Sequence, residues 1–438
     1  MKENLFLVLL FVSSSSSLWA QDHAQHEQHG GREQDADAPS PGSGTSWLPA
    51  SSPMEMFHFS SDEWIFMLHG FANFAYQEES EPRGTSEFFS TNMAMFSAGR
   101  GAGPGDFAFR FMASLEPTLG PTGYPLLLQT GETADGTNPL FDRQHPHDLL
   151  MEVALRYDLP IGRSGSVFFY FAPIGDPAIG PSAFMHRFSG VDNPVAPLAH
   201  HWLDATHISY GVLTFGWTRN DRVKLEGSIF NGTEPNADRW DVDEIKLDSF
   251  STRITVNPTP NWSVQASVGF LKSPEILHPD QDLLRMTASV THNKVLGGDA
   301  SRGNWQTIAA WGRNKWEDPL IASTGVPTGH IHFTPGVQPT RNAVLAESGI
   351  RFKGLHTVFG RWEWAEEDEL FISADRRHQL VYSVYKLNAG YLIDFLRLAH
   401  VRVGAGVYGA VHWLPDDLLF VYGERPSAYG FFFRFKII

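Results

Sequence analysis

The sequence predicts an all-β protein: a closed, antiparallel transmembrane β-barrel of about 16 strands, with 14 to 18 compatible with the spacing. Three observations predict it. Apolar and polar side chains alternate along many segments, charged residues stand on the polar faces of those segments, and short connections alternate with long ones. A closed barrel suits lipid because it leaves no sheet edge with unpaired backbone groups.

The alternation is clearest in two segments. Val401 to Trp413 reads "VRVGAGVYGAVHW", and Trp262 to Phe270 reads "WSVQASVGF". In both, every second side chain is apolar or aromatic and the residues between are small or polar. A period of two residues is typical of a β-strand with one apolar and one polar face.

The same reading gives sixteen expected strands along the chain. They lie near residues 64–77, 87–97, 105–116, 148–158, 164–173, 204–218, 222–231, 247–257, 261–271, 283–293, 303–314, 342–353, 356–366, 379–393, 400–413 and 428–438.

The connections between these strands alternate in length. "LPIGRSG", "RND", "NPTPN", "KGLH" and "DFLRLAH" are tight, whereas the connections between them are mostly long, such as Pro117 to His147 and Lys315 to Arg341. Short periplasmic turns and long extracellular loops are typical of outer-membrane barrels. With an even strand number, we expect both termini in the periplasm.

The ends of the chain give three expected regions. Residues 1–20 read as a cleaved signal peptide with the apolar core "LFLVLLFV", and residues 21–63 as a disordered, His-containing periplasmic segment. Residues 64–438 are the expected barrel. Its last segment, "YGFFFRFKII", resembles the final strand recognised by the barrel assembly machinery, although that strand usually ends in an aromatic residue.

Composition excludes several classes of protein. The chain has no cysteine, so disulfides, thiolate metal ligands and thiol redox chemistry are ruled out. The formal net charge is −16, which argues against a nucleic-acid partner, because binding to a phosphate backbone needs a positive surface. We expect location in the cell outer membrane, with lipid and lipopolysaccharide around the barrel.

Charges inside the predicted strands indicate residues that line a lumen. These are Arg110, Glu152, Arg156, Glu226, Arg253, Arg285, Glu347, Arg351, Arg361 and Arg402. Two interpretations stay open. The charges neutralise one another across the interior, or an arginine row faces the acidic loop "GTEPNADRWDVDEIKLD" and makes a transverse field at a constriction, as in porins.

Histidines gather near the expected outer end of the barrel. "DRQHPHDLL" carries His145 and His147, and "HHWLDATH" carries His200, His201 and His207. With nearby oxygens from Asp142, Asp148 and Asp204, they form a nitrogen and oxygen donor set that suits Zn, Cu or Ni ions. The alternative is that they are solvated or hydrogen-bonding loop residues. His330 with His332, and the tail "DHAQHEQH", carry the same two readings.

The sequence favours no enzyme. There is no "GxSxG" pattern, and the carboxylates form no pair with distinctive spacing. His207 and Ser209 share a strand face, but that face is expected in the lumen, not on the lipid side where a hydrolase of the membrane would work.

Residues 64–438 resemble the outer-membrane porin class. More narrowly, "DRQHPHDLL", "GDPAIGPSAFMHRFSG", "HHWLDATHISYGV", "EGSIFNG" and "NPTPNWS" are similar to segments of a family of uncharacterised bacterial outer-membrane proteins. That resemblance implies the barrel and no defined substrate, so it transfers no site residue.

These observations predict a porin-like channel for passive diffusion of small hydrophilic solutes or ions. The alternatives are a divalent-metal-binding or metal-transporting barrel that uses the loop histidines, and a structural or adhesive barrel with a blocked lumen. A homotrimer is the expected assembly, by analogy with other barrels of this strand number.

Overall fold

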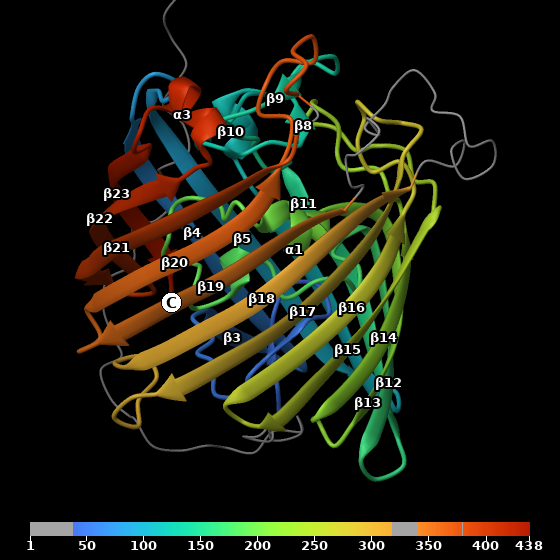
Figure 1. The fold of residues 1–438 in the computed structure, drawn as a ribbon. Helices are drawn as coiled ribbons and strands as arrows, with labels where there is room; N and C mark the ends of the chain where they lie inside the picture. Colours follow the sequence, from blue (N-terminus) through green and yellow to red (C-terminus); the bar gives the residue numbers. More distant parts are fainter. Residues whose placement is uncertain (1–37, 318–339, 379) are drawn as a thin grey trace, which may run out of the picture. The chain divides into compact units, whose positions relative to one another are not determined.

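The computed structural model describes residues 38–317, 340–378 and 380–438. In these residues sixteen antiparallel strands form one closed barrel, in which each strand pairs with the next along the chain and the last pairs with the first (Figure 1). The strands are β4 (Trp64–Glu79), β5 (Ser86–Ala102), β6 (Gly105–Ala113), β11 (Leu150–Ile161), β12 (Gly165–Gly175), β13 (Ser209–Arg219), β14 (Val223–Phe230), β15 (Ser249–Thr259), β16 (Trp262–Leu271), β17 (Asp282–Val295), β18 (Asn304–Glu317), β19 (Thr340–Phe352), β20 (His356–Glu367), β21 (Tyr382–Leu398), β22 (Val401–Trp413) and β23 (Ser427–Ile437).

The predicted fold class and all sixteen predicted strands are confirmed. Some boundaries were wrong: residues 204–208, expected to begin a strand, instead include the 3-10 turn η3 (Ala205–His207), and residue 116, expected to end a strand, begins the 3-10 turn η1 (Glu116–Leu119). The alternation of Leu213, Phe215 and Trp217 is lost in "DATHIS", so the start of that strand was placed too early. The predicted signal peptide, the tail histidines and the pair His330 and His332 lie outside the described residues.

Loop length separates the two ends of the barrel. The short turns, such as the one between β13 and β14, lie at the lower end in Figure 1, where β23 also ends. The long connections lie at the other end and carry α3 (Asp416–Tyr422) and the short pairs β7 (Tyr124–Pro125) with β10 (Arg143–Gln144) and β8 (Glu132–Thr133) with β9 (Pro139–Leu140). We call these ends the short-turn rim and the long-loop rim.

The outer face of the barrel is apolar, as β23 illustrates. Phe431, Phe433 and Phe435 are exposed, whereas Phe432 and Arg434 between them are buried in the interior. This pattern is the one expected of strands that turn alternate side chains to lipid. Within the described residues, none of the helices has the length and apolarity needed to span a bilayer.

Two inserted segments fill much of the interior. The first, residues 38–56, holds the small hairpin β1 (Ser40–Pro41) with β2 (Trp47–Leu48) and leads into β3 (Phe57–Ser61), which pairs with β4. The second, the inner loop of residues 176–208, contains η2 (Phe184–His186), α1 (His200–Leu203) and η3. We call residues 38–56 the lumen segment.

For residues 38–63, the described part of the predicted disordered segment 21–63, the structure corrects that prediction. Thr45 is buried, donates to Glu226 at 2.5 Å and accepts from Arg253 at 3.0 Å. Asn257 donates to the carbonyl of Leu48 at 3.0 Å. A polar, Gly- and Ser-rich segment cannot build a core of its own, but inside a charged barrel its hydroxyl and backbone groups find partners on the wall.

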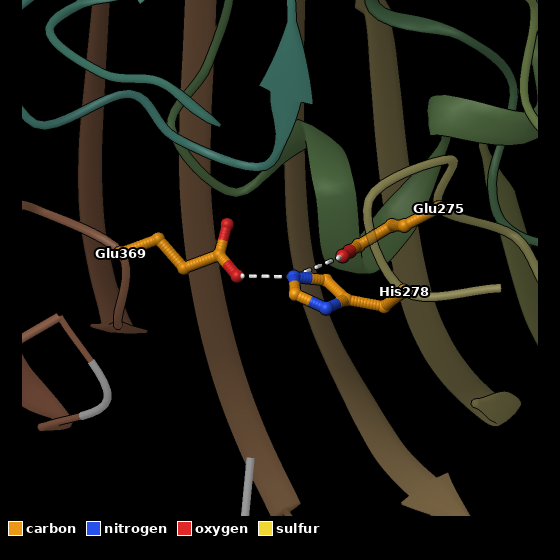
Figure 2. A group of neighbouring side chains, drawn as sticks. All are labelled: Glu275, His278 and Glu369. Carbon is orange, nitrogen blue, oxygen red and sulfur yellow. Dashed lines mark hydrogen bonds and ion pairs between the residues drawn. The ribbon is translucent and has the colours of Figure 1, made fainter. Parts of the chain in front are cut away.

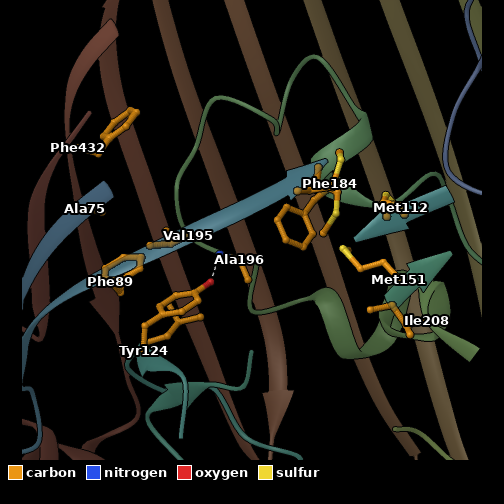
Figure 3. Packing of buried hydrophobic residues seen from close by; sticks show 14 of the residues in the cluster. Ala75, Phe89, Met112, Tyr124, Met151, Phe184, Val195, Ala196, Ile208 and Phe432 are labelled. Atoms are coloured by element: carbon orange, nitrogen blue, oxygen red, sulfur yellow. Dashed lines mark hydrogen bonds between the residues drawn. The ribbon is translucent and has the colours of Figure 1, made fainter. Parts of the chain in front are cut away.

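The inner loop packs on an apolar cluster within the barrel (Figure 3). The rings of Phe89 and Tyr124 stack with centroids 4.5 Å apart, and the Ala196 N–H donates to the Tyr124 hydroxyl at 3.0 Å. Phe184 and Ile208, from the two ends of the inner loop, belong to the same cluster. The interior is therefore partly a packed core, not only a polar wall.

Two glycines allow the inner loop to fold so tightly. Gly180 has φ +76°, and a Cβ there would lie 1.9 Å from the carbonyl oxygen of Leu203. At Gly312 of β18, a Cβ would lie 2.4 Å from the carbonyl oxygen of Trp202 in α1. A side chain at Gly180 would push apart the two parts of the inner loop that meet there. A side chain at Gly312 would push the inner loop away from the wall.

Candidate functional site

The predicted lumen residues face the interior, but most of them are buried instead of lining an open, wet pore. Eight are nearly inaccessible to solvent: Glu152, Glu226, Arg253, Arg285, Glu347, Arg351, Arg361 and Arg402. Arg110 and Arg156 are partly buried. The expectation of an open lumen is therefore corrected, because sequence alternation could not reveal the two segments folded inside.

A basic cluster lies on the wall near the short-turn rim. Glu55 of the lumen segment accepts from Arg402 at 2.8 Å and lies 2.6 Å from the ammonium of Lys436. It also accepts from Arg351 at 3.2 Å. Although burial alone raises the pKa of Glu55, these cations hold it well below its usual value. Glu55 therefore fastens the lumen segment as a buried carboxylate.

The inner loop supplies a second carboxylate to the same cluster. Asp192 pairs with Arg434 and lies 3.6 Å from both Arg351 and Lys436. Arg434 also donates to Asp394 of β21 at 2.6 Å. The two inserted segments thus meet at one group of wall cations.

A third network joins the inner loop to the middle of the wall. Glu347 accepts from Arg361 at 2.8 Å, a cross-strand pair, and from Arg187 of the inner loop at 3.2 Å. Arg187 also donates to Asp204 at 2.9 Å. Breaking such a buried pair by removing one partner is costly, because the other charge is left without compensation.

The transverse-field interpretation is not what the pairing indicates. The arginines of the predicted row take their acidic partners from neighbouring strands, the lumen segment and the inner loop: Arg110 from Glu152, Arg253 from Glu226, and Arg351 from Glu55. In the acidic loop of residues 232–248, Arg239 pairs with Asp148 at 3.4 Å, and Glu234 is the largest favourable charge near one member of the row, Arg285. Mutual neutralisation in a filled interior is therefore the better description.

A cavity of about 140 Å³ remains inside the barrel, towards the short-turn rim. Its lining includes Glu55, Met67, His69, Arg110, Arg156 and Lys436. Because a cavity of ~150 Å³ can hold a molecule as large as benzene, the space accepts several waters, an ion or one small solute. The lumen segment, the inner loop and the wall together form this narrow compartment.

The five predicted histidines come together, although they lie on two separate loops. The ring centroids of His147 and His207 are 5.2 Å apart, and those of His200 and His207 are also 5.2 Å apart. His201 lies 5.7 Å from His200 and 6.0 Å from His145. We call His147, His200 and His207 the histidine box, with His145 and His201 at its edge.

The predicted oxygen donors separate into two groups. Asp204 lies in the cluster and accepts from His200 Nδ1 at 2.8 Å. Asp142 instead pairs with Arg83 at 2.5 Å, and Asp148 accepts from the Tyr210 hydroxyl at 3.0 Å. Sequence proximity therefore assigned Asp142 to the histidines incorrectly.

Another group lies nearer the long-loop rim (Figure 2). His278 Nε2 is 3.0 Å from Glu369 Oε1 and 4.0 Å from Glu275 Oε2. Among the described residues, these three form a group whose ligand atoms all lie within 4.8 Å of one another. The arrangement suits ion pairing between His278 and the two carboxylates. It also suits a cation held by all three side chains.

Sequence reasoning missed the residues that organise these sites. Glu116 accepts from His147 Nδ1 at 2.8 Å and from the His147 N–H at 3.1 Å. Glu55 stands in the segment expected to be disordered, and Asp192 stands in a loop without periodicity. No local signal marks any of them, because their roles depend on contacts between distant parts of the chain.

The closed barrel, its apolar outer face and its charged interior define a porin-like outer-membrane β-barrel. No protein-family model matches the chain, and no curated protein matches it in sequence. Solved structures of outer-membrane proteins are similar to it. The outer membrane channel DcaP of Acinetobacter baumannii is 10% identical, with 86% of this chain and 99% of that chain covered and a TM-score of 0.49. An anion-selective porin from Comamonas acidovorans gives the same four values. For OmpF of Salmonella typhi in complex with daunomycin they are 9%, 86%, 100% and 0.49.

Proposed function

We propose that this protein is an outer-membrane channel for passive diffusion of small hydrophilic solutes or ions, and that the lumen segment narrows its path. The closed barrel with an apolar exterior supports insertion in the outer membrane. The interior is charged, and inserted segments held by side-chain contacts occupy it. Transport therefore explains the charged wall better than catalysis does. The interior contacts described above place no nucleophile next to a base.

The observation that carries this proposal is a set of buried nitrogen atoms on cationic side chains that have no hydrogen-bond partner within the described part of the protein, although other nitrogens of two of these side chains do. Arg285 Nη1, Arg361 Nη2 and Lys386 Nζ have no hydrogen-bond partner among the described residues. Buried charged donors are costly unless water or a solute satisfies them. The interior is therefore a place where water and small anions or polar solutes are stabilised.

The size of the remaining space sets the expected selectivity. In the arrangement described, the cavity of about 140 Å³ admits water and small ions. Larger solutes pass only when the lumen segment moves away from the wall, where Glu55 and Thr45 hold it. The lumen segment acts in this account as an internal gate.

Liposome swelling tests the proposed permeability. Liposomes that contain the protein are placed in isotonic solutions of uncharged solutes of increasing size and of small salts. The proposal predicts entry of salts and of the smallest solutes, with a sharp fall as solute size increases. Liposomes that admit neither would contradict it and would favour a structural barrel. A homotrimer is part of the proposal and is tested by native mass measurement in detergent.

A further inference from the structure

The histidine box is set apart from the proposed path by its chemistry. His147 enters from the loop that precedes β11, and His200 and His207 enter from the inner loop. All three residues are buried. Imidazoles in an interior usually serve as single hydrogen-bonding groups, so three of them in contact need a reason.

The Nδ1 atoms of the box all have acceptors. His147 Nδ1 lies 2.8 Å from a Glu116 oxygen, His200 Nδ1 lies 2.8 Å from an Asp204 carboxylate oxygen, and His207 Nδ1 lies 2.7 Å from the Asp204 carbonyl oxygen. An acceptor opposite Nδ1 places the ring proton there and leaves the Nε2 lone pair free. This is the arrangement that orients histidines as metal ligands.

One Nε2 atom of the box lacks any counterpart. His207 Nε2 is buried and has no hydrogen-bond partner in the part of the chain that the structure describes. Its ring is the central one, next to both His147 and His200. A buried polar atom without a partner is unfavourable, and a bound cation would satisfy it.

Two of the three ring separations agree with coordination by nitrogen. A metal to nitrogen distance of ~2.1 Å at a tetrahedral angle places two imidazole centres roughly 5 Å apart, and the centres are 5.2 Å apart for His147 with His207 and for His200 with His207. The ligand atoms of the three rings do not all lie within 4.8 Å of one another, as those of Glu275, His278 and Glu369 do. The rings would therefore have to turn towards one another on binding.

We propose that the histidine box binds one transition-metal ion with nitrogen ligands, of the Zn²⁺, Cu²⁺ or Ni²⁺ class, and so ties the inner loop to the loop that precedes β11. Three imidazoles without sulfur suit these ions and not Mg²⁺ or Ca²⁺. The proposal does not depend on channel activity, because binding is measured on the folded barrel in detergent.

The test uses the full mature chain, folded in detergent and stripped of metal, with Zn²⁺ as the probe in calorimetric titrations. Three variants are compared with it: His207→Ala in the box, His278→Ala in the other cluster, and a chain with His23, His26 and His29 changed to alanine. We expect one tight equivalent of Zn²⁺ that His207→Ala loses and the other two variants keep.

A second pair of measurements covers the case in which His207→Ala fails to fold. Asp204→Asn keeps all three imidazoles in the chain and is expected to weaken Zn²⁺ binding by about 10- to 100-fold, the usual effect of removing a partner of a ligand. Because Asp204 also pairs with Arg187, folding of this variant is checked by heat-dependent migration on detergent gels. Electron paramagnetic resonance of the chain in which His23, His26 and His29 are alanine, with one equivalent of Cu²⁺, should show at least three coupled nitrogens.

Three outcomes would overturn the proposal. The first is a chain that binds no Zn²⁺ tightly. The second is tight binding that survives His207→Ala and disappears with His278→Ala or with the tail variant. The third is a Cu²⁺ spectrum with fewer than two coupled nitrogens together with unchanged Zn²⁺ affinity in Asp204→Asn.

Discussion

Glu55 accepts a hydrogen bond from Arg351, a residue 296 positions further along the chain, at 3.2 Å. The contact joins a segment without regular periodicity to the wall of the barrel. It also places one carboxylate among three cations, since Arg402 and Lys436 approach the same group. The position of the lumen segment therefore depends strongly on a single side chain.

Glu55→Gln is expected to loosen the lumen segment. Removing one partner of a buried ion pair costs about 3–5 kcal/mol, because the other charges lose their compensation. The chain has no cysteine, so Ser52→Cys gives a unique thiol at a buried position of the segment. We expect this thiol to react with a maleimide at least about tenfold faster in the Glu55→Gln background.

The matched control for that substitution is Glu63→Gln. Glu63 forms an exposed ion pair with Arg100 at 2.7 Å, and exposed pairs contribute little to stability. The reactivity of the Ser52→Cys thiol should be unchanged in this control. Equal reaction rates in the Glu55 and Glu63 variants would contradict the fastening role of Glu55.

The docking of the lumen segment should resist mild acid. Burial raises the pKa of Glu55 in the folded protein, but Arg351, Lys436 and Arg402 lower it well below its ordinary value of 4.5. Asp192 is the other carboxylate that interacts with Glu55. For a lowered carboxyl pKa, the stabilisation is complete above the unfolded pKa and is lost as pH falls through the folded pKa.

The Ser52→Cys thiol should therefore stay protected from pH 7 down to about 4.5, and its exposure should rise only at lower pH. A pyridyl disulfide reagent, which reacts in acid, measures this exposure. Release of the segment at a pH above 4.5 would mean that another group controls it.

Gly180→Ala should displace the inner loop. A Cβ at φ +76° would lie 1.9 Å from the Leu203 carbonyl oxygen, and strained positive-φ residues cost of order 1–3 kcal/mol before any clash is counted. We expect a lower temperature for loss of the compact form on detergent gels. Gly162→Ala is the control, because Gly162 has φ +63° with open space around it. Equal effects of the two variants would show that the close approach to Leu203 is unimportant.

Phe184→Ala should destabilise the barrel more than Phe433→Ala. Phe184 is 8% exposed and packs in the interior cluster, whereas Phe433 is 50% exposed on the outer face. An interior cavity costs about 3–5 kcal/mol for a phenylalanine, while lipid fills the space at the outer position and leaves a loss of about 1.5–3 kcal/mol. Reversible unfolding in urea measures both values, and the reverse order would contradict a packed interior.

The sequence allowed prediction of the wall of the barrel but not of its contents. Alternation in segments such as Val401 to Trp413 follows directly from a strand with lipid on one side, so each strand carries its own signal. The lumen segment carries none, because its serines and glycines have the composition of a disordered tail and order only against Glu226, Arg253 and Asn257.

The sequence also allowed only part of the candidate metal site to be predicted, because local patterns reveal the histidines but not their partners. The two histidine motifs could be found as patterns, and their meeting required only that two long loops fold inward. The partners Glu116 and Asp204 Oδ1 fix the ring orientations, and Asp142 is drawn away by Arg83. Such choices among equivalent carboxylates depend on three-dimensional distances that spacing along the chain does not contain.

Single-channel conductance in planar bilayers is the most direct test of the internal gate. A chain that begins at residue 21 is compared with the same chain lacking residues 38–52, and folding of both is checked by heat-dependent migration on detergent gels. The account predicts small, uniform channels for the full chain and conductance several times larger after the deletion. Equal conductance of the two folded proteins, or no channels from either, would contradict it.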